Sequence, residues 1–431
     1  MFFCVQTRMT PEPSIPTSVA DSSQARATAE AVARRSYGKL VAFLAVRTRD
    51  VATAEDALSE AFASALIDWT RNGCPTNPEA WLLTAARRKA IDVSRSRQRH
   101  ELAAEQWKIM AERLEATLPE TEIPDQRLAL MFACAHPAID AAIRPPLILQ
   151  VVLGLDAKAI ASAFLMSPAA IGKRLVRAKK KIRQAGIPFR IPEREELPAR
   201  LEDVLDAIYT AFAEGWTDPG GTDPARRDLT EEAIYLAQLV VELMPEEPEA
   251  LGLLALLLHA EARRNSRRGK SGEYIPLAEQ NPDLWDSLMI FRAETLLRRA
   301  SERGSLGRYQ LESALQSAHV FRCRTGQNNW MEVLKLYDVL LALTASPVVA
   351  INRAHALAEV SGPSAGLDAL QYRSSDARLA EYQPYWATRA ALLARAGATC
   401  EARQAYEIAI GLERDPAVRL FLQNRQALLT P

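Results

Sequence analysis

Hydrophobic residues recur at helical spacing along most of the chain, and the alternation that marks β-strands is nearly absent. Apolar positions at i, i+3 and i+4 place one apolar stripe along a helix. Between Ala25 and Gln98 the pattern predicts four helices, and it locates three of them, at Ala25–Thr48, Ala52–Trp69 and Glu79–Arg97. We therefore expect an all-α fold.

A pair of short helices joined by a tight turn is predicted within residues 157–183. Ile160 and Phe164 belong to the apolar face of the first helix. Ser167 and Pro168 mark the start of the second, because Ser caps free backbone N–H groups and Pro suits the first helical position.

The second helix of this pair is rich in cations. Ile171 and Leu175 continue the apolar stripe, and seven basic residues surround or follow it: Lys173, Arg174, Arg177, Lys179, Lys180, Lys181 and Arg183. Such a helix can place its first turns in a DNA major groove while its basic end holds phosphates. An ordinary helical hairpin with a solvated charged face has the same pattern, and this segment alone does not separate the two.

Pairs of helices are predicted to repeat from about Leu197 to the end of the chain. The clearest unit, Tyr385–Pro416, approximates the spacing of a tetratricopeptide repeat, whose period is about 34 residues. Its small and large apolar positions are Ala390, Leu393, Ala402, Tyr406 and Ala409. The alternative is a generic helical bundle rich in Ala and Leu.

Composition sets the broad class. The chain has 431 residues, of which 48% are hydrophobic, enough for two or three domains. No run of about 18 apolar residues occurs, so we expect no membrane association. Residues 1–24 are rich in Pro, Ser and Thr and lack a signal-peptide pattern, which predicts a disordered tail. Five scattered cysteines indicate a reducing compartment, and the expected location is cytoplasmic.

The net charge of zero combines two halves of opposite sign. Residues 1–190 hold 27 Lys and Arg against 19 Asp and Glu, a balance of +8, so the remaining residues hold 26 against 34, a balance of −8. The basic half suits nucleic acid. The acidic half suits a protein partner or the basic half itself.

Sequence motifs for enzymatic chemistry are missing. The chain has no glycine-rich phosphate loop after a strand, no HExxH and no CxxC, and its five histidines are far apart. We therefore expect that it is not an enzyme and that it uses no metal or cofactor.

Two segments ahead of the helix pair carry a family resemblance. AEDALSEAFASALIDW (residues 54–69) and PEAWLLTAARRKAIDVSRSRQR (78–99), followed in order by the helix pair, resemble regions two and four of a bacterial RNA polymerase sigma factor of the extracytoplasmic-function (ECF) type. Residues 306–319 and 336–367, with the repeat-like tail, resemble the subgroup that has a fused tetratricopeptide-like extension.

The resemblance implies a division of the chain. It gives a disordered tail (1–24), sigma region two (25–99), a linker (100–125), sigma region four with a helix-turn-helix (126–186), a hinge (187–196) and a helical regulatory extension (197–431). It also implies a sigma factor that binds core RNA polymerase, at the β′ clamp helices and the β flap, and that recognises promoter DNA at the minus-ten and minus-thirty-five elements to direct transcription initiation.

Site residues follow from the resemblance. The polymerase-binding residues are expected to be Asp56, Glu60 and Phe62, with a solvated acidic stripe over a core helix as the alternative. Minus-ten contacts are expected from Asn72, Asn77, Arg87, Arg88, Lys89 and Arg95. Minus-thirty-five contacts are expected from Ser167, Ala170, Lys173, Arg174, Arg177 and Lys180, with Lys179 to Lys181 on phosphate. The family usually has Asn near Arg88, Glu at Ala159 and Gly at Leu165, which leaves the base-capturing residue and the promoter preference open.

The extension is expected to regulate activity, through contact with the sigma modules or with polymerase. Tyr309, His319, Asn352 and Arg353 are candidates to line a groove in it, with structural packing as the alternative. A competing hypothesis for the whole chain is a one-component helix-turn-helix regulator with a repeat-type sensor domain, which would bind duplex DNA without polymerase.

Overall fold

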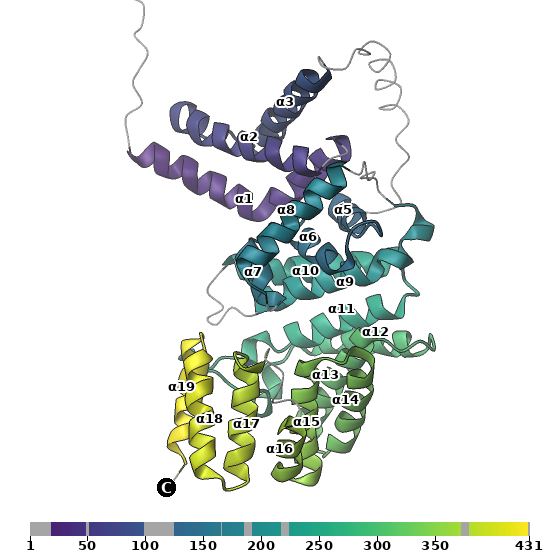
Figure 1. The fold of residues 1–431 in the computed structure, drawn as a ribbon, viewed down its shortest axis with the longest axis vertical. Coiled ribbons are helices and arrows are strands. Elements are labelled where there is room, and N and C mark those ends of the chain that lie inside the picture. Colours follow the sequence, from purple (N-terminus) through teal and green to yellow (C-terminus); the bar gives the residue numbers. More distant parts are fainter. Residues whose placement is uncertain are drawn as a thin grey trace, which may run out of the picture. The chain divides into compact units, whose positions relative to one another are not determined.

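A computed structural model describes residues 19–48, 51–98, 125–164, 166–184, 192–216, 224–371 and 379–429. Over these residues the regular structure is helical, with one isolated β-bridge between Arg268 and Tyr274 and no strand, so the predicted all-α fold is confirmed (Figure 1). Two compact units are present. The first draws on residues 1–122, 129–156 and 172–197, and the second on residues 123–128, 157–171 and 198–431.

Three helices form the N-terminal part of the first unit: α1 (Val19–Thr48), α2 (Val51–Asn72) and α3 (Pro78–Gln98). The prediction of four helices here was wrong for the described residues, which form three, and the three located helices match α1, α2 and α3. The three helices pack against one another. Trp69 of α2 is 1% exposed, and its ring meets that of Trp81 edge-on at 5.6 Å, so Trp81 anchors the core.

Gly38 allows α1 to lie directly against backbone. A Cβ atom at this position would stand 1.6 Å from the carbonyl oxygen of Val152, at the end of α6 (Arg144–Val151). Nearby, Gly154 has a φ of +67°, which favours glycine, and the ring of Tyr37 covers it. Helix α1 therefore packs closely against the turn that follows α6.

Short helices follow α3 in the described chain: α5 (Gln126–Cys134), η1 (Ala141–Ile143), α6, α7 (Ala157–Ala163) and α8 (Pro168–Gln184). Three consecutive residues of α6, Leu147, Ile148 and Leu149, are at most 1% exposed, so this helix is largely buried. Helix α8 begins at Pro168 as predicted, and the Ser167 hydroxyl accepts a hydrogen bond from the Ala170 backbone N–H at 3.3 Å.

The rest of the second unit is a succession of helices. In order they are α9 (Pro198–Trp216), α10 (Pro224–Leu243), α11 (Pro248–Glu261), α12 (Ser287–Ser301), α13 (Arg308–Thr325), α14 (Trp330–Thr344), α15 (Pro347–Ser361), α16 (Pro363–Gln371), α17 (Gln383–Arg395), α18 (Thr399–Leu412) and α19 (Pro416–Ala427). Proline begins many of them because the first helical N–H has no partner within the helix.

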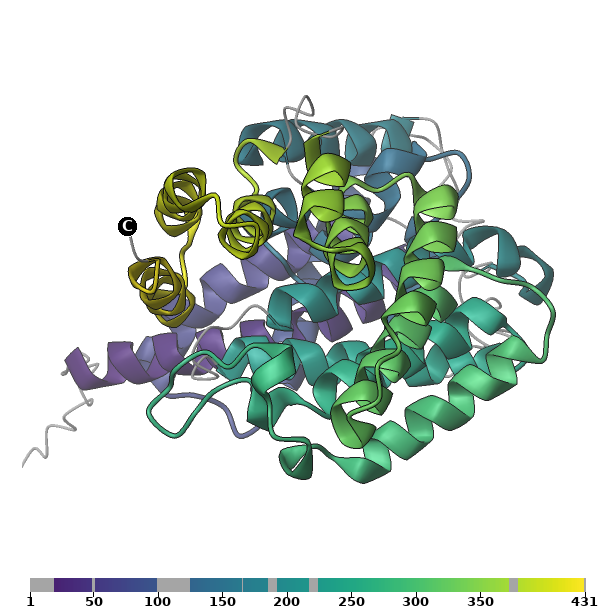
Figure 2. The ribbon, with the colours of Figure 1, turned by 90° about the horizontal axis from the view of Figure 1, so that it is seen from below.

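The last three helices lie side by side in both views (Figures 1 and 2). Ala390, Ala402 and Ala409 are completely buried between them, in one cluster with Leu393 and Tyr406. The small residues let the helices approach, and the large ones fill the space opposite, as the sequence pattern predicted for this pair.

Candidate nucleic-acid interface

Helix α8 has a buried stripe and a cationic exposed face. Ile171, Leu175 and Ala178 are at most 9% exposed, which turns the remaining positions outward. The four cations predicted for the minus-thirty-five contact are all exposed: Lys173, Arg174, Arg177 and Lys180. Of the other two, Ser167 is exposed at the helix start and Ala170 is half-buried.

Val176 is an apolar residue on this exposed face that the sequence reasoning missed. Its side chain is 68% exposed, and Lys173, Arg177 and Lys180 lie three before, one after and four after it. The signal was available, because Val176 falls off the stripe of Ile171 and Leu175. An apolar side chain among cations suits the major groove, where thymine presents a methyl group.

Lys179 differs from its neighbours. Its Nζ lies 2.6 Å from Glu55 Oε2 on α2, and the two side chains are only 20% and 14% exposed. Burial, with the Glu55 charge adding to it, raises the pKa of Tyr37 to about 12 and raises that of the Cys134 thiol. Because the side chains of Lys179 and Glu55 are both largely buried, Lys179 is held in an internal ion pair, in contrast to the predicted phosphate contact.

The predicted polymerase-binding residues lie on α2. Asp56 and Glu60 are exposed on one face and Phe62 is half-buried. Glu60 Oε2 is 3.4 Å from Lys89 Nζ on α3, with both side chains about half exposed. Farther along the same helix, Ile67 is 58% exposed, so the outer surface of α2 changes from acidic to apolar.

The predicted minus-ten residues divide into two groups. Asn72 donates a hydrogen bond to Asp68 at 2.8 Å, and Asn77 caps α3 by accepting one from the Ala80 backbone N–H at 3.0 Å. Arg87, Arg88 and Lys89 are exposed in consecutive positions of α3. The side chain of Arg95 lies outside the described residues.

An ion pair joins α5 to α10 within the second unit. Arg127, whose side chain is 9% exposed, pairs with Glu232 through Nη1 and with Asp125 Oδ2 through Nη2 at 3.0 Å. Its guanidinium also lies 5.7 Å from the ring centre of Tyr235. Because Arg127 is largely removed from water, these carboxylates are what compensates its charge.

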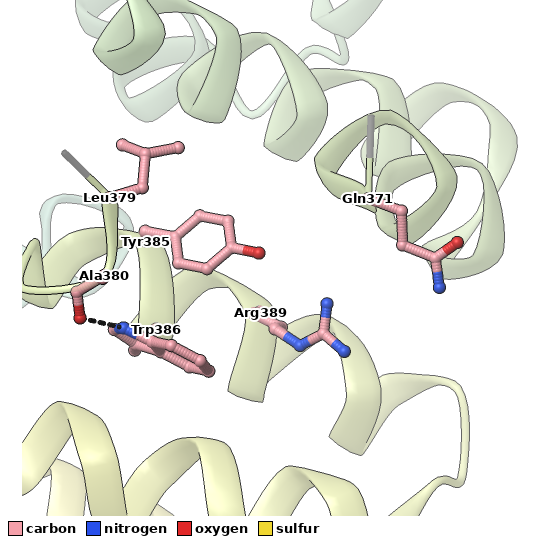
Figure 3. Close-up of a pocket in the computed structure, with 6 residues that line it drawn as sticks. All are labelled: Gln371, Leu379, Ala380, Tyr385, Trp386 and Arg389. Carbon is pink, nitrogen blue, oxygen red and sulfur yellow. Dashed lines mark hydrogen bonds between the residues drawn. The ribbon is translucent and has the colours of Figure 1, made fainter. Parts of the chain in front are cut away.

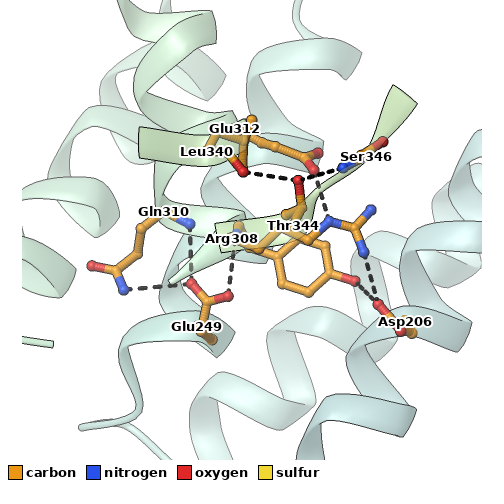
Figure 4. Close-up of polar contacts among 9 residues, drawn as sticks. Asp206, Glu249, Arg308, Gln310, Glu312, Leu340, Thr344 and Ser346 are labelled. Carbon is orange, nitrogen blue, oxygen red and sulfur yellow. Dashed lines mark hydrogen bonds and ion pairs between the residues drawn. The ribbon is translucent and has the colours of Figure 1, made fainter. Parts of the chain in front are cut away.

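Tyr309 belongs to a polar network between α13 and α9, whose members Asp206 and Arg308 are labelled in Figure 4. It is 3% exposed, and its hydroxyl donates to Asp206 Oδ1 at 2.5 Å. Arg308 reaches the same oxygen at 3.1 Å and Glu312 at 2.8 Å. Burial, followed by the Asp206 charge, raises the pKa of Tyr309 well above its usual value.

The start of α13 is capped by a distant carboxylate, which local sequence gave no reason to expect. Glu249 of α11 accepts hydrogen bonds from the backbone N–H groups of Tyr309 and Gln310 at 2.9 and 3.1 Å (Figure 4). Gly307 leaves room for it, because a Cβ there would stand 2.2 Å from Glu249 Cδ. Tyr309 thus lies in a network that fastens α13 to its neighbours.

His319 lies in a different cluster, around Trp330. The rings of His319 and His355 meet Trp330 edge-on at 6.1 and 5.6 Å, and Arg322 covers its face at 3.8 Å. Arg322 Nη2 is 2.6 Å from His319 Nδ1. Burial and the Arg322 charge lower the pKa of His319 to about 3, so the imidazole is neutral near pH 7.

The remaining two predicted residues of the extension are on α15. Asn352 is exposed, and Arg353 Nε donates to Asp338 Oδ1 of α14 at 2.5 Å. Tyr309, His319 and Arg353 thus have separate sets of partners.

No single helix among the described residues is both long and apolar enough to cross a bilayer. The successive helices Ala157–Ala163 and Pro168–Ile182, bent by 108° at their junction, have together the length and composition of a span, and nothing beyond length and composition suggests one.

Comparison with known proteins adds family matches. Residues 32–100 match sigma-70 region 2, and residues 200–301 match a family of unknown function, DUF6596. The uncharacterized protein R00370 of Rhizobium meliloti (strain 1021) is 36% identical over 381 residues, which cover 87% of this chain and 89% of that protein. No solved structure matches. The sigma-70 region 2 match supports the role of a sigma factor in transcription initiation. This chain therefore belongs to the same protein family as the Rhizobium protein.

Proposed function

We propose that this chain is an ECF-type sigma factor that binds core RNA polymerase, recognises minus-ten and minus-thirty-five elements, and is regulated by its fused helical extension. The observation that carries the proposal is the order of the parts. The sigma-70 region 2 match at residues 32–100 precedes a helix pair whose second member has an exposed cationic face. Catalysis of RNA synthesis belongs to the polymerase.

Sequence reading at the minus-thirty-five element is assigned to residues 126–186. The short connection between α7 and α8 suits a helix-turn-helix, in which the second helix lies in the major groove. Arg174 and Arg177 are suited to guanine, which accepts two parallel hydrogen bonds from one guanidinium. Lys173 and Lys180 suit phosphate, and Val176 suits a thymine methyl.

Promoter melting and polymerase binding are assigned to residues 25–99. Arg87 and Arg88 form the exposed cationic group that this role needs for a single strand. Asp56 and Glu60 offer carboxylates to a basic helical partner, and Ile67 extends their face with an apolar contact. Polymerase binding would have to compete with the Glu60–Lys89 pair.

Regulation is assigned to the extension, which we propose to be tetratricopeptide-like. The packing of α17 against α18 supports the repeat. The pairing of Arg127, within the proposed region four, with Glu232 of α10 supports a contact between the extension and the sigma modules.

A double-mutant cycle tests the Arg127–Glu232 contact. Arg127→Gln, Glu232→Gln and the double variant should give a coupling free energy of about 1–3 kcal/mol in urea unfolding of the second unit, because the pair is largely buried. The Arg227–Glu231 pair on the same helix is more than 60% exposed and serves as the control, with an expected coupling below about 0.5 kcal/mol. Equal couplings for the two pairs would contradict the proposed contact.

Reconstitution with polymerase tests the function itself. Purified chain is mixed with bacterial core RNA polymerase, and association and transcription from selected genomic DNA are measured. We expect a stable complex that starts transcription at defined sites, and only weak duplex binding by the chain alone. Tight, site-specific duplex binding that needs no polymerase would favour the one-component regulator instead.

A further inference from the structure

The C-terminal helices enclose a cavity that none of the proposed sigma functions uses. Its volume is about 580 Å³, and it is lined by Gln371, Leu379, Ala380, Tyr385, Trp386 and Arg389 (Figure 3). This size is within the range of small-molecule sites, roughly 300–1,000 Å³.

An aromatic wall of this cavity is held in place by the protein. Trp386 Nε1 donates a hydrogen bond to the Ala380 carbonyl oxygen at 2.9 Å. Its ring meets that of Tyr385 edge-on, with centres 5.3 Å apart and planes at 81°. Because the indole is already fixed, a flat ligand can pack against it at low cost in side-chain entropy.

Two polar groups on α17 point into the cavity, and neither has a polar partner among the residues that the structure describes. The Tyr385 side chain is 4% exposed, yet its hydroxyl has no hydrogen-bond partner among the described residues. The Arg389 guanidinium, one turn later, has no carboxylate partner in the same part of the chain. Figure 3 shows both groups directed at the same space, with the Gln371 amide on the opposite wall.

The Tyr385 hydroxyl and the Arg389 guanidinium together offer hydrogen-bond donors to one anion in this space. We propose that this cavity binds a small aromatic carboxylate. Arg389 pairs with the carboxylate in a two-pronged arrangement, the Tyr385 hydroxyl donates to it, and Trp386 covers the ring.

The charge of the lining selects a carboxylate over a phosphate. Arg389 is the single cation among the lining residues that the structure describes, and it matches one negative charge. A phosphate group with nearly two charges would remain half compensated in an apolar cavity. Leu379, Ala380 and Trp386 supply the apolar contact that a purely polar anion could not use.

Binding of benzoate and indole-3-carboxylate to the full chain tests the inference, by calorimetry or by ligand-observed NMR. We expect each acid to bind at least about 10-fold more tightly than its neutral amide, since a hydrogen bond to a charged group is worth that factor or more. Arg389→Gln should weaken binding of the acids by at least about 10-fold, and Tyr385→Phe by about 3-fold or more.

Matched controls separate the site from the fold. Arg395→Gln removes a cation from the same helix, one that is paired with Glu359, and should leave acid binding unchanged. Arg389→Gln should unfold at the wild-type temperature, because no ion pair or hydrogen bond to another described residue is lost. Binding of a peptide that ends in Phe is measured with a free and with an amidated C-terminus. Binding of the free-carboxylate form indicates a peptide C-terminus as the source of the carboxylate, whereas binding of the small acids alone indicates a free acid.

Equal binding of acid and amide, or wild-type affinity in Arg389→Gln, would overturn the proposal. So would the absence of acid binding at probe concentrations of about 5 mM, where even weak sites fill. The assay contains no polymerase and no DNA, so its failure leaves the proposed sigma function untouched.

Discussion

Replacing Lys173, Arg177 and Lys180 together with glutamine is expected to lower transcription from a cognate promoter by about 100-fold, while binding to core polymerase is retained. All three side chains are exposed on the face of α8 opposite Ile171 and Leu175. Each of the two lysine contacts with phosphate releases a counterion, so the plot of log affinity against log salt should also become shallower by about 1.8. Run-off transcription and DNA binding by the polymerase complex across a KCl series measure both effects.

A charge-matched variant controls for a general loss of positive charge. Arg292, Arg298 and Lys335 are exposed in the extension, and their replacement by glutamine should leave transcription within about two-fold of wild type. If the two triple variants lose activity equally, α8 has no special role in promoter binding. If neither loses activity, the DNA-binding face lies elsewhere.

Gly38→Ala is expected to destabilise the first unit by about 3 kcal/mol or more. The added methyl would stand 1.6 Å from the Val152 carbonyl oxygen, and no flexible side chain there can move away, so α1 and the end of α6 must separate. A chain with two units does not unfold in one step, so the readout should be local. Hydrogen exchange in peptides from α1 and from residues 144–156 should accelerate strongly.

Gly172→Ala is the matched control for this prediction. Gly172 lies in a helix of the same unit, and a Cβ there would meet no heavy atom within 4 Å. That change should stabilise α8 by about 0.5–1 kcal/mol, because alanine loses less backbone entropy than glycine. Unchanged exchange in Gly38→Ala would mean that α1 does not rest on Val152.

Much of the local structure was predictable because it depends on residues within one helical turn of each other. The Ser167–Pro168 start of α8, its buried Ile171 and Leu175, and the buried alanines of α17 and α18 all follow from capping and spacing. The same reasoning gave four helices between Ala25 and Gln98, where the described residues form three, although its single helix at Ala25–Thr48 lies within α1. It gave no sign that α1 packs through Gly38 against the backbone of Val152.

The candidate site was predictable in part for the same reason. The exposed cations of α8 follow once its apolar stripe is known. Lys179 does not, because its partner Glu55 is 124 residues away in the sequence. The sequence pattern gave Lys179 and Lys180 the same role, and only packing within the first unit separated them.

The sequence by itself determined that this chain is helical, where most helices begin, and which helix is cationic, since these properties arise from periodicity and capping over a few residues. Tertiary structure decided which charges remain exposed, that Glu249 caps α13, and that Tyr385 and Arg389 face one cavity. Those outcomes depend on segments brought together from far along the chain, and no local pattern encodes which partner a side chain will meet.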